Sequence, residues 1–461
     1  MPVSRLLIAN RGEIAVRIIR AARELGLQTV QVASRADLDM PAARLADQVV
    51  EIGPPQAARS YLSIEAILRA AETSGADAVH PGYGFLAENA AFAEAVERAG
   101  LTFVGPRPET IRLMGDKAAA RAAAAAAGVP TVPGTEGRLA DSAAAREAAA
   151  RIGFPLMIKA AAGGGGRGIR IAEDMAGLET LLQQAAAEAG ASFGDAGLYL
   201  ERCVPRARHV EVQVLGDGES VIHLFERECS VQRRRQKLWE EAPAACLDDA
   251  TRAALCDSAV RLAQSVGYRG AGTLEYLFDA ASGDFYFIEM NTRIQVEHPV
   301  TEAITGIDLV REMIRIAAGE RLRWRQDAIT RRFHAIECRI NAEDPARGFL
   351  PSPGRIESLR LPGGPGVRFD AAIEAGGIVP PFYDSLLGKL IVWDETRDAA
   401  LRRMARALAE LEIGGVATTI PLGRALAAAP DIRAGRVHTT WLESWLAQHD
   451  FTPEREAEPI P

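Results

Sequence analysis

Short apolar runs alternate with amphipathic segments in the first quarter of the chain. The apolar runs span residues 6–10, 29–33, 78–80 and 102–104, and segments with helical periodicity span residues 14–25, 64–73 and 90–99. Buried strands that alternate with helices are typical of a parallel sheet with helices on both faces. We therefore predict a doubly wound, Rossmann-like α/β domain over residues 1–115. No GxGxxG motif follows its first strand, so the pattern does not favour a dinucleotide site.

A stretch of almost pure alanine at residues 118–127 begins the next part of the chain. Alanine is the strongest helix former, so this stretch predicts a helix and not a disordered linker. Gly128-Val129-Pro130 is a sequence that ends a helix. Residues 131–203 then form a small β/α unit around a glycine-rich loop. We predict a central domain over residues 116–330, with residues 131–203 as its lid subdomain.

Beyond Arg331 the pattern changes to antiparallel strands separated by proline and glycine turns. The expected strands span residues 333–340, 354–361, 367–370 and 388–393, and a helix is expected at residues 397–411. We predict a β-rich C-terminal domain over residues 331–447 and a flexible, polar tail over residues 448–461. The whole chain therefore combines an α/β with an α+β organisation.

Composition excludes several classes of protein. The 461 residues are 48% apolar and 25% charged, with a net charge of −8, which provides no basic surface for nucleic acid. No window approaches the roughly 18 apolar residues of a membrane span, and the N-terminus lacks the apolar stretch of a signal peptide. The five cysteines are scattered without a CxxC pair, as expected for free thiols in a reducing compartment. We therefore expect a cytoplasmic enzyme.

Lysine is rare in this chain. The only four are Lys117, Lys159, Lys237 and Lys389, against 49 arginines. Arginine is a planar fork, whereas lysine is a compact point charge on a flexible stem. Each remaining lysine is thus a candidate for a position where the fork does not fit, although a biased codon supply would also leave a few by chance.

Three features suggest a phosphate site. Lys159 ends an apolar strand and is followed by the glycines at 163–166, whose backbone N–H groups would wrap phosphate oxygens. This loop is not a Walker A motif, and a flexible hairpin without a ligand is the alternative. Lys117 follows Gly115-Asp116 and would be a second phosphate contact or a surface lysine. His209 lies among arginines on an alternating strand, beside an anion or in a structural role.

Two acidic residues suggest a metal site. Glu275 and Glu289 lie in apolar segments, where a carboxylate is costly unless it is paired or coordinating. The turn at residues 280–284 would join two adjacent strands and bring them together. Magnesium prefers oxygen ligands, and the amide oxygen of Asn291 would be a third. A pair of salt-bridged carboxylates is the alternative.

Arg293, Gln295 and Glu297 share a parity if their segment is extended, so they would face one space. A cation, an amide and a carboxylate suit a planar anion such as bicarbonate. Glu297 would then be the general base that takes the bicarbonate proton, while Arg293 and Lys237 hold the charge that develops on phosphoryl transfer. Glu302 and His298 would be supporting or structural.

These residues resemble biotin carboxylase, a family with the ATP-grasp fold. The motifs cover residues 3 to 447 in order and are Arg11–Ala15, His80–Phe85, Met114–Lys117, Lys159–Gly168, Glu226–Arg234, Glu289–His298, Glu337–Asp344 and Tyr383–Ser385. The resemblance implies an ATP-grasp core with an α/β domain before it, a glycine-loop lid and a C-terminal β-rich domain. It also implies that ATP converts bicarbonate to carboxyphosphate, which carboxylates N1 of biotin.

The resemblance further implies roles for individual residues. The nucleotide would be bound by Lys117, Lys159, Gly165, Gly166, Glu201, Arg202, Cys203, Val204, His209, Gln232, Arg235, Leu277, Glu275 and Glu289. Mg²⁺ or Mn²⁺ would be bound by Glu275, Glu289 and Asn291, and bicarbonate by Lys237, Arg293, Gln295, Val296 and Glu297. Biotin would be bound by Arg339, Tyr83 and Asp384, with catalysis by Arg293, Glu297, Lys237 and Arg339. A homodimer interface would lie near Arg20, Glu24 and Arg368.

Three positions depart from the family pattern. Arg235 replaces a histidine near the ribose, Ala162 replaces the first glycine of the loop, and Ala87 replaces a serine. None removes a metal ligand, the base or the biotin arginine. Lys389 follows the Tyr383–Ser385 motif, and we hypothesise that it also serves the biotin pocket.

Two other functions are compatible with an ATP-grasp core: a ligase that joins an acyl phosphate to an amine, and a non-catalytic paralogue that binds nucleotide. The context of Glu297 and Arg339 argues against the first, and the intact set of charged residues against the second. The chain has no biotinyl-lysine context, so biotin should arrive on a biotin carboxyl carrier protein, with separate carboxyltransferase subunits. The final acceptor, whether acetyl-CoA, another acyl-CoA or pyruvate, is not written in the sequence.

Overall fold

The computed structural model describes residues 3–135, 137–160, 170–193, 196–449 and 451. They form two compact units. The first comprises Met1–Val129, Arg208–Tyr276 and Glu289–Pro461, and the second comprises Pro130–Ala207 and Leu277–Ile288. Within the described residues, no helix is both long and apolar enough to cross a membrane.

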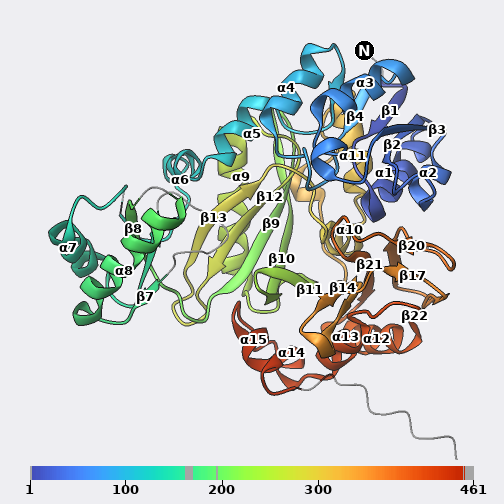
Figure 1. The fold of residues 1–461 in the computed structure, drawn as a ribbon. Helices are drawn as coiled ribbons and strands as arrows, with labels where there is room; N and C mark the ends of the chain where they lie inside the picture. Colours follow the sequence, from blue (N-terminus) through green and yellow to red (C-terminus); the bar gives the residue numbers. More distant parts are fainter. Residues whose placement is uncertain (1–2, 136, 161–169, 194–195, 450, 452–461) are drawn as a thin grey trace, which may run out of the picture. The chain divides into compact units, whose positions relative to one another are not determined.

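The first unit begins with a five-stranded sheet in the order β3-β2-β1-β4-β5, and all of its strands are parallel (Figure 1). Its strands are β1 (Arg5–Ile8), β2 (Gln28–Ser34), β3 (Gln48–Gly53), β4 (Ala78–His80) and β5 (Thr102–Phe103). Its helices are α1 (Gly12–Glu24), α2 (Pro41–Leu45), α3 (Ile64–Ser74), α4 (Ala90–Arg98) and α5 (Pro108–Gly115). The predicted doubly wound sheet is confirmed. The sequence pattern missed β3 because this edge strand is mostly exposed and carries polar residues.

The strand order of this sheet reverses between β1 and β4, and the loops that follow these two strands lie side by side. The Asn10 side chain joins them, since its Nδ2 donates to the carbonyl oxygens of Pro81 at 2.6 Å and Tyr83 at 2.7 Å. Residues after either strand can therefore meet at one point. Glu13, in the first turn of α1, and Tyr83, after β4, are such a pair.

An eight-stranded sheet follows, in the order β13-β12-β9-β10-β11-β14-β21-β19. Its strands are β9 (Arg208–Asp217), β10 (Val221–Arg233), β11 (Gln236–Ala242), β12 (Arg269–Phe278), β13 (Phe285–Asn291), β14 (His334–Asn341), β19 (Val367–Ala371) and β21 (Leu386–Asp394). β12 and β13 are neighbours, as the metal-site hypothesis requires.

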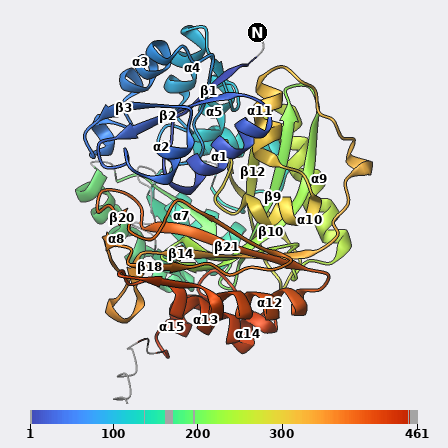
Figure 2. The ribbon, with the colours of Figure 1, turned by 90° about the vertical axis from the view of Figure 1, so that its right-hand side faces the viewer.

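Helices cover both faces of this sheet around β14 and β21. On one face lie α12 (Arg397–Glu410), α13 (Ile420–Ala428), α14 (Pro430–Arg433) and α15 (Trp441–Leu446), seen in a row in Figure 2. Their core includes Ile336 and Leu390. The opposite face packs Ala335 and Ile391 against α10 (His298–Thr305). The alternation of adjacent residues between two cores is the two-residue period of a strand that is buried on both faces.

The remaining helices of the first unit are α6 (Lys117–Ala126), α9 (Asp249–Ser265) and α11 (Leu309–Ala317). The alanine helix was thus predicted correctly, and it begins at Lys117 with Asp116 as its N-cap. The predicted strand at residues 354–361 is instead two short strands, β17 (Gly354–Arg355) and β18 (Ser358–Arg360). They pair with different partners, β20 (Ile378–Val379) and β22 (Glu412–Gly414), so the segment must change direction between them.

The second unit contains a three-stranded antiparallel sheet in the order β7-β6-β8. Its strands are β6 (Leu156–Ala160), β7 (Arg170–Ala172) and β8 (Leu198–Arg202), and its helices are α7 (Ser142–Ile152) and α8 (Met175–Phe193). Ile158 and Leu200 on the sheet share one small core with alanines of α7 and α8. The glycines at 163–166, with Ala162, lie outside the described residues.

We predict that α4 depends on its N-cap. The Asn89 Oδ1 accepts a hydrogen bond from the Phe92 N–H at 2.9 Å. Asn89→Ala should lower the free energy of unfolding by about 1 kcal/mol and the melting temperature by roughly 2 °C in calorimetry. Asn89→Asp keeps the acceptor and is the matched control. Equal melting temperatures for Asn89→Ala and the unsubstituted protein would contradict this assignment.

Candidate active site

A fully buried arginine lies among the strands of the large sheet. Arg227 on β10 has a side-chain exposure of 0%. Its five N–H groups donate to the side-chain oxygens of Glu211 at 2.6 Å, Gln213 at 2.7 Å, Thr301 at 3.0 Å, Thr273 at 3.1 Å and Gln295 at 2.8 Å. A buried charge is tolerated only when it is paired and fully hydrogen-bonded, and Arg227 meets both conditions. It therefore fixes the side chains of Glu211 and Gln295.

Lys237 reaches three carboxylates from the start of β11. Its Nζ lies 2.5 Å from Glu211, 3.0 Å from Glu275 and 2.7 Å from Glu297. A register irregularity directs it there: Val231 pairs with Trp239 but Gln232 pairs with Lys237, so β11 holds one extra residue. Such a bulge turns the next side chain to the other face. Strict alternation would have placed Lys237 with Trp239 in the apolar core.

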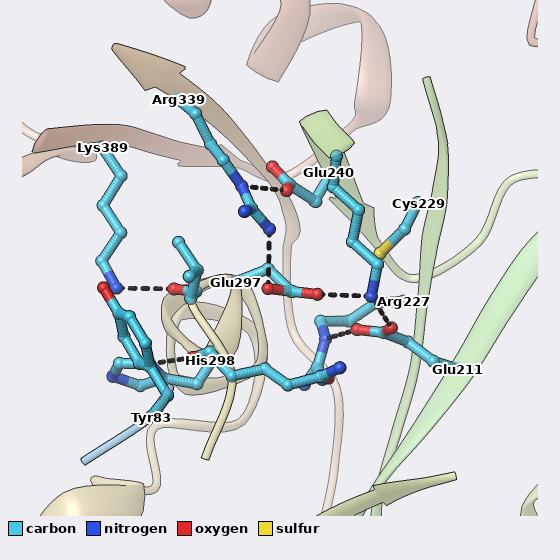
Figure 3. Close-up of polar contacts among 12 residues, drawn as sticks. Tyr83, Glu211, Arg227, Cys229, Glu240, Glu297, His298, Arg339 and Lys389 are labelled. Atoms are coloured by element: carbon cyan, nitrogen blue, oxygen red, sulfur yellow. Dashed lines mark hydrogen bonds and ion pairs between the residues drawn. The ribbon is translucent and has the colours of Figure 1, made fainter. Parts of the chain in front are cut away.

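Glu297 is held between two cations just before α10. Its Oε1 accepts from Lys237 at 2.7 Å, and its Oε2 accepts from the Arg339 guanidinium at 2.9 Å (Figure 3). Burial alone would raise its pKa, but the Lys237 ammonium, assisted by Arg339, lowers the pKa of Glu297 below its usual range. Glu297 is therefore ionised at neutral pH.

Arg339 on β14 bridges Glu297 and a second buried carboxylate. Its Nε donates to Glu240 Oε1 at 2.6 Å. Burial opposes the charge of Arg339, yet the carboxylates of Glu240 and Glu297 raise its pKa above the usual value. Lys237, Glu297, Arg339 and Glu240 thus form one continuous line of alternating charges. This line is the geometric centre of the candidate site.

The predicted metal ligands lie near one another in the first unit. The Glu275 Oε1 accepts from Asn291 Nδ2 at 2.9 Å, and Gln295 Nε2 donates to the same oxygen at 2.8 Å. Burial and the charge of Glu275 raise the pKa of Glu289, as expected for carboxylates that share a site without a cation. Two close carboxylates and an amide oxygen fit the preferences of Mg²⁺.

Arg293 does not join Gln295 and Glu297 as the parity argument required. Its Nε donates to Glu88 at 2.7 Å and its Nη2 to Asn291 Oδ1 at 2.9 Å. The expectation of a uniformly extended segment was wrong, because the chain bends after Asn291 and turns at Val296 and Glu297 into α10. Gln295 and Glu297 still meet, through Arg227 and Lys237.

The expected nucleotide residues of the first unit form two groups. Lys117 is exposed at the start of α6, and its charge acts on Glu289. His209 lies 3.2 Å from Glu275 Oε2, outside hydrogen-bond geometry, and Gln232 Nε2 lies 3.0 Å from its Nδ1. Burial opposes protonation, but the Glu275 charge raises the pKa of His209 to about 9. His209 is therefore a cation at neutral pH, as an anion-binding role requires.

Arg235 occupies a tight turn. It is exposed between β10 and β11, with φ of +68° after Arg234 at +47°. Two consecutive residues with positive φ are the geometry of a type I′ hairpin turn, which favours asparagine and glycine. The departure at Arg235 therefore carries backbone strain.

In the second unit, Lys159 on β6 forms an ion pair with Glu201 on β8, which lies directly beside it in the sheet. Glu201 and Cys203 are buried, Arg202 is exposed and Val204 is half-buried. Leu277, at the end of β12, also belongs to this unit. Gly165 and Gly166 lie outside the described residues.

The expected biotin residues separate into a close pair and an outlier. Tyr83 donates a hydrogen bond to Glu13, and the charge of Arg339 acts on the Tyr83 hydroxyl, so these two side chains lie near each other. Asp384 is exposed and accepts from the backbone N–H of Leu386 at 2.9 Å.

Sequence reasoning missed three buried acids: Glu211, Glu240 and Glu337. Glu211 was detectable, because it shares the parity of His209 in an otherwise apolar strand. Glu240 and Glu337 are cross-strand partners on β11 and β14, which only the sheet register brings together.

Glu337 is an isolated acid. Neither of its carboxyl oxygens has a hydrogen-bond partner among the described residues, and Glu240 Oε2 also lacks one. Burial raises the pKa of Glu337 well above its usual value, Lys389 offsets this only in part, and Glu240 adds to it. Burial, offset by Arg339, raises the pKa of Glu240 to about 7. Glu337 is therefore a neutral acid at neutral pH.

Comparison with family models matches three segments of the chain. Residues 2–111 match the biotin carboxylase N-terminal domain, residues 116–325 match the ATP-binding domain of the carbamoyl-phosphate synthase L chain, and residues 337–444 match the biotin carboxylase C-terminal domain. The matches follow one another without overlap along the chain.

Individual proteins are similar over nearly the full length. A biotin carboxylase of Nostoc sp. is 53% identical over 96% of this chain and 99% of its own. The biotin carboxylase–β,γ-ATP complex of Campylobacter jejuni has a TM-score of 0.89 and 46% identity, and covers 97% of this chain and 99% of its own. The biotin carboxylase domain dimer of Hydrogenobacter thermophilus 2-oxoglutarate carboxylase, with MgADP and bicarbonate, has a TM-score of 0.89 and 47% identity, and covers 98% and 100%.

We predict that Glu337→Gln changes stability only at high pH. A carboxyl whose folded pKa is raised contributes its full stability below the unfolded pKa of about 4.5, and loses it as pH rises towards the folded pKa, by about 1.4 kcal/mol per pH unit. An amide does not titrate. The variant should match the unsubstituted protein in melting temperature at pH 5 and exceed it at pH 8. A variant that is less stable at pH 8 would show that Glu337 is ionised.

Proposed function

Because this chain belongs to the biotin carboxylase family, we propose that it uses MgATP to activate bicarbonate and transfers the carboxyl group to N1 of biotin on a separate carrier protein. The observation that carries this proposal is the Glu297 carboxylate between Lys237 and Arg339. The same two cations would attract an anionic substrate to the base. Such an arrangement serves acid–base chemistry on an anion, and it argues against a non-catalytic nucleotide-binding protein.

The chemistry follows from the charges around Glu297. Bicarbonate bound to Lys237 and Arg339 would share their positive charge and weaken their hold on Glu297, so the carboxylate becomes more basic. Glu297 then accepts the bicarbonate proton. A bicarbonate oxygen forms a bond to the γ-phosphorus as the bond to ADP breaks, which gives carboxyphosphate. Arg227 holds Gln295, which would orient the anion, and Arg293 would leave Glu88 to bind developing charge.

We assign the nucleotide and metal residues by the same reasoning. Lys117, Lys159 and His209 would bind phosphate, and Gly165 and Gly166 would close over it. Glu201, Arg202, Cys203, Val204 and Leu277 would frame the adenine, with Gln232 and Arg235 near the ribose. Glu275, Glu289 and Asn291 would hold Mg²⁺ or Mn²⁺, which supplies charge neutralisation for phosphoryl transfer when bound. Arg339, Tyr83 and Asp384 would bind biotin.

The carboxyl group then passes to biotin. Carboxyphosphate releases its carbon dioxide unit when the C–O bond to phosphate breaks, and phosphate can take the N1 proton as the N–C bond forms. Arg339 would stabilise the negative charge that biotin carries after losing this proton. Tyr83 lies near Arg339 and would line the same pocket.

We further propose that the enzyme works with a biotin carboxyl carrier protein and carboxyltransferase subunits, as a homodimer that pairs near Arg20, Glu24 and Arg368. The dimeric Hydrogenobacter domain supports this assembly. The five unpaired cysteines support a cytoplasmic location. The proposed domains, residues 1–115, 116–330 and 331–447, agree with the limits of the three family models, and the acceptor differs among relatives.

The activity is tested with the purified chain, MgATP, bicarbonate and free biotin. ADP formation should depend on bicarbonate and rise with biotin, and label from [¹⁴C]bicarbonate should appear in an acid-labile biotin adduct. Glu297→Gln should lower this rate by roughly 10²- to 10⁴-fold, because an amide cannot accept the proton.

Nucleotide binding by Glu297→Gln should remain, as measured by calorimetric titration with ADP. Glu410→Gln, an exposed position paired with Arg406, is the matched control and should retain full activity. ADP formation that is independent of bicarbonate, or stimulated by an amino acid instead of biotin, would contradict the proposal.

A further inference from the structure

Lys389 is a buried cation with no assigned part in the chemistry. Its side chain has an exposure of 0% on β21. Arg339 on β14 lies opposite it on one side, and Asp370 on β19 lies opposite it on the other. Two cations directly across a strand pair repel each other. The position of Lys389 therefore requires compensating anions and a reason for the charge.

Two contacts supply that reason. The Lys389 Nζ donates to the backbone carbonyl of Val296 at 2.5 Å and lies 3.1 Å from Glu13 Oε1. Glu13 accepts the hydroxyl hydrogen bond of Tyr83. Figure 3 shows Lys389 and Tyr83 approaching the turn that carries Glu297. Tyr83, Glu13, Lys389 and Val296 are thus connected in one chain of contacts.

The Val296 carbonyl controls the position of the base. The peptide group that joins Val296 to Glu297 is planar, so its carbonyl oxygen, its N–H and the Glu297 Cα lie in one plane. Holding the oxygen restricts rotation of this plane. Glu297 also begins α10, which fixes its other side. A donor at Val296 consequently sets the direction in which the Glu297 carboxylate points.

Lysine suits this position better than arginine. A compact ammonium can serve a carbonyl and a carboxylate in a narrow, fully buried space. A guanidinium would bring five N–H groups and additional volume, which a close-packed interior does not accept without rearrangement. In a chain with 49 arginines, a lysine here is consistent with a geometric requirement.

We propose that Lys389, together with Glu13, is a positioning residue that ties the Glu297 turn to the Tyr83 side of the biotin pocket. This inference rests on the proposed function of Glu297 and Tyr83. Lys389 acts through the Val296 carbonyl and through Glu13, and it touches no reacting atom. A disturbance at either end of the contact chain is transmitted to the other.

The test compares Lys389→Arg, Lys389→Met and Glu13→Gln by steady-state kinetics, with KM and kcat measured separately for bicarbonate, ATP and free biotin. The KM for bicarbonate should rise roughly 10- to 100-fold in the Lys389 variants, as expected for a displaced reacting group, while the KM for ATP stays within about twofold. Glu13→Gln keeps the acceptor for Tyr83 and should raise the KM for biotin less than Lys389→Met does. Tyr83→Phe combined with Lys389→Met should be non-additive for biotin.

Arg252→Lys is the control for the loss of a buried ion pair away from the site, since Arg252 on α9 pairs with Glu226 at 2.7 Å. It should lower stability and leave every KM unchanged. If Lys389→Met does not fold, Lys389→Arg and Glu13→Gln decide. Unaltered KM values for bicarbonate and biotin, or a fall in kcat alone, would overturn the positioning role. An unsubstituted enzyme without bicarbonate-dependent ADP formation would instead overturn the proposed function.

Discussion

The carboxylate of Glu297 is buried and ionised, and it retains its charge because Lys237 and Arg339 hold one oxygen each. A buried ion pair is stable only if its remaining hydrogen-bonding groups are satisfied. Glu211 and Glu240 satisfy the cations, and Arg227 satisfies Glu211 from the opposite side. The eight-stranded sheet is the frame for this line of charges, because its register determines which of these side chains meet.

The fold was predictable where burial leaves a clear pattern. The parallel strands β1, β2 and β4 are buried on both faces and appear as short apolar runs, so the first sheet could be predicted. The edge strand β3 faces solvent and has no such run. The segment at residues 354–361 appeared as one strand, because the change of pairing partner between β17 and β18 depends on distant segments of the chain.

The candidate site was predictable only in part. Lys237, Glu275 and Glu297 were identified from their motifs, and they do meet. Their geometry was not available from local alternation: the bulge in β11 redirects Lys237, and the bend before α10 sends Arg293 towards Glu88. Glu240 and Glu337 escaped notice because their importance arises from a cross-strand register. Local patterns predict which residues are unusual, whereas the sheet determines which of them cooperate.

The central claim is that bicarbonate, deprotonated by Glu297, attacks the γ-phosphorus of ATP. Its most direct test is one turnover with [¹⁸O]bicarbonate, followed by mass analysis of the phosphate released. The bond from bicarbonate oxygen to phosphorus persists when carboxyphosphate breaks at its C–O bond, so the phosphate should carry one labelled oxygen. Phosphate without label would show that water is the nucleophile, and it would contradict the account.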